Sequence, residues 1–496
     1  MTAALANAPA NTAPQSGASK LDPSAQSLLA ERSAIDATTS GPVLFFFGTS
    51  ILWLLLASLL GLISSIQLHS PTFLADIPIF TYGRLVPVYN QVLGFGWAMM
   101  SGMGAAIWML ARLCRVEVKF PRVLVAGGIF WQVGLLLGIY QILIGKSTGV
   151  EGLELPGSAV VVMLIGYLLI ALWGGLTFGY RRESPAYISV WYIITALFWF
   201  PWTLAIGYLS LQLDSVQGVM QSIVAAWAVQ NFFNVVITAL GLAMAYYLIP
   251  KVVNRPIHNY QLASTGFWAF LLFSGLTGMV RLSGGPVPVW LVTLSISSTI
   301  LLLIQTVTVS ANLLLTMRGE YQLTYYSPTI RFTAFGVMAF ALASVIGLLT
   351  SLRSVDRILH FTFFQSAQNH LLLYAFFSMV MFGAMYYIVP RLVGCEWLSS
   401  SMISCHFWAS AYGGGLLIAV LGIGGIAFGT SLANPEAMFS QVIQSGAVYY
   451  IASTIAWGML LIGHLIFALH FLLMACRIGQ PAGEATLFAP IGEEKH

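Results

Sequence analysis

The chain has 496 residues, of which 58% are hydrophobic and 7% charged, and its mean hydropathy is +0.86. No soluble fold can bury so much apolar surface, so the composition excludes a soluble globular protein and indicates an integral membrane protein. The formal net charge of +4 is not gathered in a basic patch, which argues against a nucleic-acid partner.

Residues 1–40 differ in composition from the rest of the chain. They are rich in Ala, Pro, Ser and Thr and contain no apolar segment of the kind that signal peptides carry. Such a composition cannot bury enough apolar surface to fold, so we expect a disordered cytoplasmic tail.

From Pro42 onward, apolar runs long enough to cross a bilayer alternate with short loops rich in Pro, Gly and charge. The runs are too long for membrane strands and lack alternation with a period of two. We predict an all-α integral membrane protein with one membrane domain over residues 41–478 and a short cytoplasmic tail over residues 479–496. The predicted transmembrane helices are 43–66, 90–113, 123–145, 157–179, 188–211, 222–249, 262–284, 288–316, 331–351, 365–389, 403–428 and 447–475.

The distribution of Lys and Arg predicts the orientation, because short basic loops stay in the cytoplasm. With the N-terminus inside, only five of the 20 Lys and Arg residues lie outside, namely Arg84, Lys146, Arg281, Arg353 and Arg357. We therefore expect both termini in the cytoplasm.

Several kinds of site find no support in the sequence. The four cysteines fall at predicted inner helix ends, where disulfides are rare, and no CxxC, GxxxxGK[ST] or strand-associated GxGxxG motif occurs. Every Asp and Glu lies in a tail, a loop or a helix end of the predicted map. Ion-coupled carriers usually hold a carboxylate at mid-membrane, so a carrier is disfavoured.

Four segments of the chain resemble one known family. These are TYGRLVPVYNQVLGFGWAMMSG (81–102), the run AVQNFF to GFWAF (228–270), SGLTGMVRLSGGPVPVW (274–290) and QNHLLLYAFFSMVMFGAMYYIVPRLVG (368–394). They are similar to subunit I of the cbb-type (C-family) haem-copper oxidases, and the twelve-helix plan agrees. The resemblance implies a subunit that reduces dioxygen at a haem facing a copper ion, fed by a second, low-spin haem.

In that family six histidines bind the three redox centres, and the resemblance assigns their positions in this chain. Tyr89 replaces a low-spin haem ligand in the second helix, and Gln230 replaces a copper ligand in the sixth. Val280 and Arg281 replace the adjacent pair of copper histidines, and Ser274 replaces the tyrosine that cross-links to a copper ligand.

The tenth helix normally carries two histidines, and here these positions are Gln368 and His370. Residues two apart on a helix point about 200° apart, so we expect Gln368 to face the dioxygen site and His370 the low-spin haem site. Five of the six ligand positions are thus replaced.

The replacements predict that copper and dioxygen reduction are absent. A glutamine offers a weak neutral oxygen, Val280 offers no lone pair, and Arg281 carries a permanent charge that repels a metal ion. Gln368 is not a ligand that high-spin haem iron takes.

The low-spin haem position is less altered, because His370 is retained opposite Tyr89. These two residues could hold at most one b-type haem, and only if the phenol ionises. The alternative is that His370 forms hydrogen bonds in a collapsed pocket. Of the other histidines, His406 is expected at a helix end, whereas His464 and His470 lie about 240° apart on the last helix, so no metal site is expected there.

The replaced positions lie on helices that converge in the family. A bundle of this kind without copper and haem is therefore predicted to contain a cavity of about several hundred Å³, and an empty cavity of that size lowers the stability of the fold. We expect a hydrogen-bonded cluster there, in which Gln230 or Gln368 accepts from Arg281 and the space is closed by Phe232, Phe273 and Phe364. The competing geometry has Arg281 extending to the outer interface.

The sequence therefore predicts a subunit I-like protein of a respiratory or electron-transfer complex in a bacterial inner membrane, acting as a non-catalytic scaffold beside a membrane-anchored c-type cytochrome. Two alternatives stay open. One is a haem-containing terminal oxidase or nitric-oxide-handling relative with a non-standard ligand set, and the other is a membrane channel or carrier.

Overall fold

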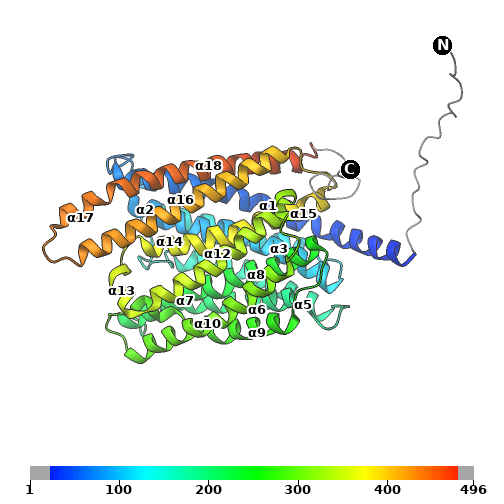
Figure 1. Cartoon of the computed structure of the whole chain (residues 1–496), viewed down its shortest axis with the longest axis horizontal. Coiled ribbons are helices and arrows are strands. Elements are labelled where there is room, and N and C mark those ends of the chain that lie inside the picture. Colours follow the sequence, from blue (N-terminus) through cyan, green and yellow to red (C-terminus); the bar gives the residue numbers. More distant parts are fainter. Residues whose placement is uncertain (1–22, 479–496) are drawn as a thin grey trace, which may run out of the picture.

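The computed structural model describes residues 23–478, and twelve of its helical segments are long and apolar enough to cross a membrane, as predicted. They pack into one elongated bundle (Figure 1). The predicted tails at residues 1–22 and 479–496 lie outside the described residues. The segments are Ser27–His69, Tyr82–Cys114, Pro121–Leu143, Gly157–Gly179, Ile188–Ser210, Val219–Val253, Tyr260–Leu282, Val289–Thr316, Pro328–Ser351, Phe364–Val393, Ser400–Leu432 and Phe439–Ala475.

Most of these segments are continuous α-helices. They are α1 (Pro23–His69), α4 (Pro121–Leu143), α5 (Gly157–Gly179), α6 (Ile188–Ser210), α10 (Val289–Thr316), α12 (Pro328–Ser351) and α16 (Ser400–Leu432). The seventh segment joins α9 (Tyr260–Phe273) to two short 3₁₀ helices, η4 (Ser274–Leu276) and η5 (Gly278–Leu282), and the twelfth joins α17 (Phe439–Ser445) to α18 (Ala447–Ala475). Short helices in the connections are η1 (Pro78–Phe80), α11 (Leu323–Tyr326) and α13 (Arg353–Leu359).

The remaining three segments each contain a π-helical stretch between two α-helices. The second is α2 (Tyr82–Gln91), η2 (Val92–Ala98) and α3 (Met99–Cys114). The sixth is α7 (Val219–Asn231), η3 (Phe232–Ile237) and α8 (Thr238–Val253), and the tenth is α14 (Phe364–His370), η6 (Leu371–Ser378) and α15 (Met379–Val393).

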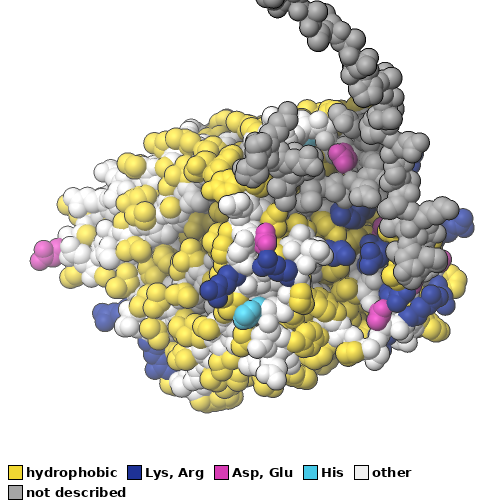
Figure 2. All heavy atoms as spheres, turned by 45° about the vertical axis from the view of Figure 1, so that its right-hand side comes forward, with side chains coloured by type: hydrophobic (Ala, Val, Ile, Leu, Met, Phe, Trp, Pro, Cys, Tyr) yellow, Lys and Arg dark blue, Asp and Glu magenta, His cyan; other side chains and the backbone are white. Residues whose placement is uncertain are grey.

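These three interrupted segments form the centre of the bundle. Their most apolar windows are 100%, 83% and 94% buried, whereas those of the other nine segments are 28–56% buried. The outer helices expose apolar side chains along their length, so the flank of the molecule is largely hydrophobic (Figure 2). This arrangement suits a bundle whose outer helices face lipid.

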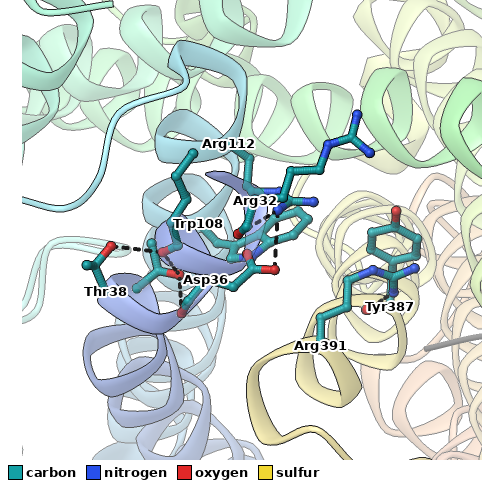
Figure 3. A network of polar contacts seen from close by, with 9 residues as sticks. Arg32, Asp36, Thr38, Trp108, Arg112, Tyr387 and Arg391 are labelled. Carbon is teal, nitrogen blue, oxygen red and sulfur yellow. Dashed lines mark hydrogen bonds and ion pairs between the residues drawn. The ribbon is translucent and has the colours of Figure 1, made fainter. Parts of the chain in front are cut away.

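The N-terminal helix is longer than expected. α1 begins at Pro23, so the prediction of a disordered tail is wrong for residues 23–40. Asp36 anchors this extension, because the indole N–H of Trp108 donates to Asp36 Oδ1 at 3.0 Å and Arg112 pairs with Asp36 Oδ2 at 3.3 Å (Figure 3). The partners come from α3, which composition alone does not reveal.

The start of α1 and the end of α18 lie at the same end of the bundle (Figure 1), where Lys and Arg side chains gather (Figure 2). The loops 144–156 and 352–363 lie at the opposite end, because three and nine membrane segments, both odd numbers, separate them from the start of α1. Which end faces the cytoplasm stays a prediction of the charge pattern.

Candidate functional site

Two cavities lie side by side near the end of the bundle that carries the loops 144–156 and 352–363. The larger has a volume of about 620 Å³ and the smaller about 110 Å³. Arg281 of η5 and Asn369 of α14 line both, so these two side chains stand at the boundary between them.

The larger cavity is lined by all five positions that the family resemblance assigned to the lost dioxygen centre. Gln230 comes from the end of α7, Ser274 from η4, Val280 and Arg281 from η5, and Gln368 from α14. Residues from three transmembrane segments thus converge on one space.

Arg281 is held by two amide side chains inside this space. Its Nε–H donates to Gln230 Oε1 at 2.8 Å, and Nη2 donates to Asn369 Oδ1 at 3.2 Å. The predicted cluster is therefore confirmed for Gln230, and the alternative in which Arg281 extends away from it to the interface is wrong.

Gln368 does not join Arg281, so that part of the prediction is wrong. Its Oε1 accepts from the hydroxyl of Thr350 in α12 at 3.1 Å. The partner of Arg281 on the tenth segment is instead Asn369, which also accepts from Gln365 Nε2 at 3.2 Å. Sequence reasoning missed Asn369, although it stands between the two positions that drew attention.

The expected aromatic closure of the space is also wrong. Phe364 lines the larger cavity and Phe232 the smaller one, whereas Phe273 lines neither. A volume of about 620 Å³ stays open, and short polar side chains such as Ser344 and Thr299 share its lining with apolar ones such as Leu302.

The tenth segment divides its side chains between the two cavities, as the helical geometry predicts. Gln368 lines only the larger cavity, and His370 lines only the smaller one together with Tyr89. The two former histidine positions therefore still face opposite sides of the helix.

His370 and Tyr89 form a direct hydrogen bond, with 2.7 Å between Tyr89 Oη and His370 Nε2. His370 Nδ1 lies 2.7 Å from the carbonyl oxygen of Ser366, which can only accept, so Nδ1 carries the proton and Nε2 accepts from the phenol. Trp457 packs edge-on against both rings, with centroid distances of 5.4 and 5.8 Å.

This pair does not fit an iron ion between its two ring atoms. A metal ion needs about 2 Å to a ligand atom on each side, hence about 4 Å between opposite ligands. The observed 2.7 Å separation is too short, and Tyr89 is placed as a neutral donor rather than as a phenolate. A haem bound at His370 therefore requires this hydrogen bond to open.

The larger cavity does not fit copper either. The guanidinium of Arg281 occupies the place where neutral imidazoles would be needed, and the oxygen of Gln230 already accepts a hydrogen bond from Arg281 Nε. Within residues 23–478 no group of three His, Cys, Asp or Glu residues has the geometry to hold a metal ion.

The three π-helical stretches follow the former ligand positions closely. η2 begins three residues after Tyr89, η3 two residues after Gln230, and η6 directly after His370. Hydroxyl groups bond carbonyls five residues back in two of them, from Thr238 to Phe233 and from Ser378 to Leu373. π-helical turns are often found at functional sites. The π-helical distortion is thus present at all three positions, although Tyr89 and Gln230 replace the histidines at two of them.

Further buried histidines form a polar cluster away from the two cavities. His464 bonds Ser58 through Nδ1 and Tyr374 through Nε2, each at 2.5 Å, and His406 Nδ1 bonds Tyr386 Oη at 2.9 Å. His406 lies in the second turn of α16, near the helix end expected for it, and is fully buried inside the bundle. Both ring nitrogens of His464 are thus bonded, whereas Nε2 of His406 has no partner among the described residues.

One carboxyl group outside the membrane segments accepts a hydrogen bond from a side chain that lines the smaller cavity. Glu154, in the loop between α4 and α5, accepts from Gln91 Nε2 at 2.5 Å, and Gln91 lines that cavity. Burial raises the pKa of the Glu154 carboxyl, while hydrogen bonds from the backbone of Gly152 and from Gln91 act in the opposite direction.

Comparison with known proteins gives a consistent result. Residues 41–460 match the family described as Cytochrome C and Quinol oxidase polypeptide I. The bacteroid cytochrome c oxidase subunit 1 homolog of Bradyrhizobium diazoefficiens is 26% identical over 466 residues, covering 89% of this chain and 83% of that protein. The cbb3-type cytochrome c oxidase subunit CcoN1 of Stutzerimonas stutzeri is 23% identical over 387 residues, covering 77% and 82% respectively.

A solved structure of a heme-copper terminal oxidase dimer has the same fold. It superposes with a TM-score of 0.70 at 14% identity and covers 90% of this chain and 85% of that one. The matched family spans most of the membrane bundle, including both cavities and all of the replaced ligand positions. The chain therefore belongs to the family of cytochrome c and quinol oxidase subunit I, with relatives among the cbb3-type subunits.

Proposed function

We propose that this chain is a non-catalytic subunit I homologue, which acts as a membrane scaffold within a respiratory or electron-transfer complex. The observation that supports this most directly is the hydrogen-bonded guanidinium of Arg281, which lies on the cavity where the family resemblance puts copper. A fixed cation held by amides disfavours a copper ion and a haem iron in the same space.

The proposed scaffold holds no copper and at most one b-type haem, with His370 and Tyr89 as the residues that would bind it. A haem there depends on opening the bond between these two side chains. The proposed partner is a membrane-anchored c-type cytochrome, in a bacterial inner membrane, with both termini of this chain in the cytoplasm.

The test is a chemical analysis of the complete chain, purified in a mild detergent beside an active cbb-type oxidase prepared in the same way. We expect less than stoichiometric copper, at most one haem b per chain by pyridine haemochrome, and no cyanide-sensitive oxygen uptake. One copper per chain, or oxygen uptake that cyanide stops, would overturn the proposal.

The partner is tested separately in native membranes of the source organism. Chemical cross-linking followed by affinity purification of this chain is expected to recover a haem-stained c-type cytochrome. Recovery of the chain without any such cytochrome would contradict the proposed partner.

A further inference from the structure

The larger cavity contains polar groups that nothing in the described chain satisfies. The hydroxyl oxygen of Ser274, whose residue is 2% exposed, and Nε2 of Gln305, whose residue is 4% exposed, have no hydrogen-bond partner among residues 23–478. Both residues line this cavity, from η4 and α10 respectively. Buried polar atoms are rarely left without a partner. These two atoms are themselves closed off from the open space, so each can find a partner there only when its side chain turns toward the cavity.

The charge of Arg281 is only partly compensated, because Glu151, which lines the same cavity, attracts the guanidinium without forming an ion pair with it. No carboxylate of the described residues forms an ion pair with it. Asp356 on the cavity lining pairs with His360 at 3.1 Å, and Glu151 lies on the lining without reaching the guanidinium. A lone cation inside a membrane protein is costly unless an opposite charge accompanies it.

Each amide oxygen around Arg281 already accepts at least one hydrogen bond. Gln230 Oε1 accepts from Arg281, and Asn369 Oδ1 accepts from both Arg281 and Gln365. Gln368 Oε1 accepts from Thr350. Arg281 has five N–H donors and two of them are bonded, so it retains donors toward the cavity. The arrangement therefore favours a ligand that accepts hydrogen bonds and carries negative charge.

The size of the cavity indicates an organic ligand. A volume of about 620 Å³ is within the usual range for small-molecule sites, about 300–1,000 Å³, and far above the volume of about 30 Å³ that a water molecule takes. The lining includes Gly149–Glu151 of one connection and Asp356 and Leu359–Thr362 of another, so the space extends to this end of the bundle.

We propose that this cavity is a binding site for a small organic monocarboxylate, whose carboxylate pairs with Arg281 and whose body fills the adjoining space. Ser274 and Gln305 supply further donors when their side chains turn toward the ligand. Guanidinium and carboxylate groups match in shape and form paired, charge-assisted hydrogen bonds. The site requires neither haem nor copper nor the cytochrome partner. It therefore goes beyond the scaffold role, and a test of the site is independent of a test of that role.

The probe is benzoate, with benzamide as its neutral counterpart of the same shape, titrated by calorimetry into the complete purified chain in a non-ionic detergent. We expect benzoate to bind at least about tenfold more tightly than benzamide, since hydrogen bonds to charged groups contribute about 1.5–3 kcal/mol. The variant Arg281→Gln is expected to lose this preference. The variant Arg353→Gln, which alters an exposed guanidinium at the same end of the bundle, is expected to keep it.

A second variant keeps the test valid if Arg281→Gln does not fold. Gln305→Leu removes a donor that has no protein partner, so it is expected to leave thermal stability unchanged and to weaken benzoate binding about threefold or more. Equal binding of benzoate and benzamide, or unchanged benzoate affinity in both cavity variants, would overturn the site. Chloride that binds as tightly as benzoate would overturn the assignment to an organic anion.

Discussion

The hydrogen bond between Arg281 and Gln230 leads to a measurable coupling energy. Gln230→Leu removes the acceptor that lies 2.8 Å from Arg281 Nε and leaves a charged N–H without its partner. Hydrogen bonds to charged groups contribute about 1.5–3 kcal/mol to the free energy of unfolding. Hydrogen bonds between side chains of different helices in one membrane protein contributed only about 0.6 kcal/mol on average in double-mutant cycles, with a maximum of about 1.7 kcal/mol.

Two features of the structure place this pair between those values. The charge and the partial burial favour a large coupling, whereas the adjoining cavity of about 620 Å³ lets water replace part of the lost bond. We therefore expect Gln230→Leu to lower the free energy of unfolding by about 1–2 kcal/mol and to show a similar coupling with Arg281→Met. The double variant is expected to be close to the wild-type chain, because it leaves no polar group without a partner.

The assay is unfolding by sodium dodecyl sulfate in mixed micelles, followed by tryptophan fluorescence, for the wild type, both single variants and the double variant. A matched control is the exposed pair in which Arg353 Nη2 donates to Thr293 Oγ1 at 3.0 Å at the same end of the bundle. Its cycle, with Arg353→Met and Thr293→Val, should give a coupling near zero. Changes at Arg281 and Gln230 that add within about 0.3–0.5 kcal/mol would refute the reasoning.

Three further predictions concern the rest of the chain. A cysteine introduced at the exposed Asp214 should react with an impermeant maleimide added to intact cells. The native, exposed Cys476 should react with the same reagent only after the cells are permeabilised. The reverse pattern would contradict the predicted orientation. Burial raises the pKa of Glu154, so its protonated carboxyl stabilises the folded chain fully below its ordinary pKa near 4.5, and this contribution is lost as the pH rises through the folded pKa. The melting temperature of the wild type should therefore fall relative to that of Glu154→Gln between about pH 4 and about pH 8. A constant difference between the two melting temperatures would show that Glu154 does not titrate in this way. Gly429→Ala should lower the free energy of unfolding by about 1–3 kcal/mol, because a Cβ there would collide with the backbone oxygen of Ile358. Gly415→Ala in the same helix places its Cβ in open space and should be neutral or slightly stabilising. Equal effects of the two substitutions would show that α16 and α13 do not pack closely.

Properties that follow from composition and spacing were predictable from the sequence. Twelve apolar runs separated by short polar loops determine twelve transmembrane helices, because a bilayer satisfies the backbone only in closed hydrogen-bonded structures. The division of Gln368 and His370 between two cavities follows from the rotation per residue of a helix. The family resemblance placed Gln230, Ser274, Val280, Arg281 and Gln368 at the lost dioxygen centre, and these five residues line one cavity.

Other properties were decided by which neighbours the packed helices bring within reach. The amide of Gln368 meets Thr350 of α12, so Arg281 bonds Asn369 instead, and no local pattern distinguishes these two amides. The helix that starts at Pro23 depends on contacts with α3, whereas the composition of the same residues indicated disorder.

The state of the retained histidine was also decided by tertiary structure. The sequence determined that His370 and Tyr89 occupy positions that face each other in the family, and both could be read as haem ligands. Only the tertiary structure brings Tyr89 Oη of α2 and His370 Nε2 of α14 to 2.7 Å from each other, and only the carbonyl of Ser366 determines which nitrogen of His370 carries the proton. Hydrogen-bond geometry depends on distances of a few tenths of an ångström, which helix periodicity does not specify.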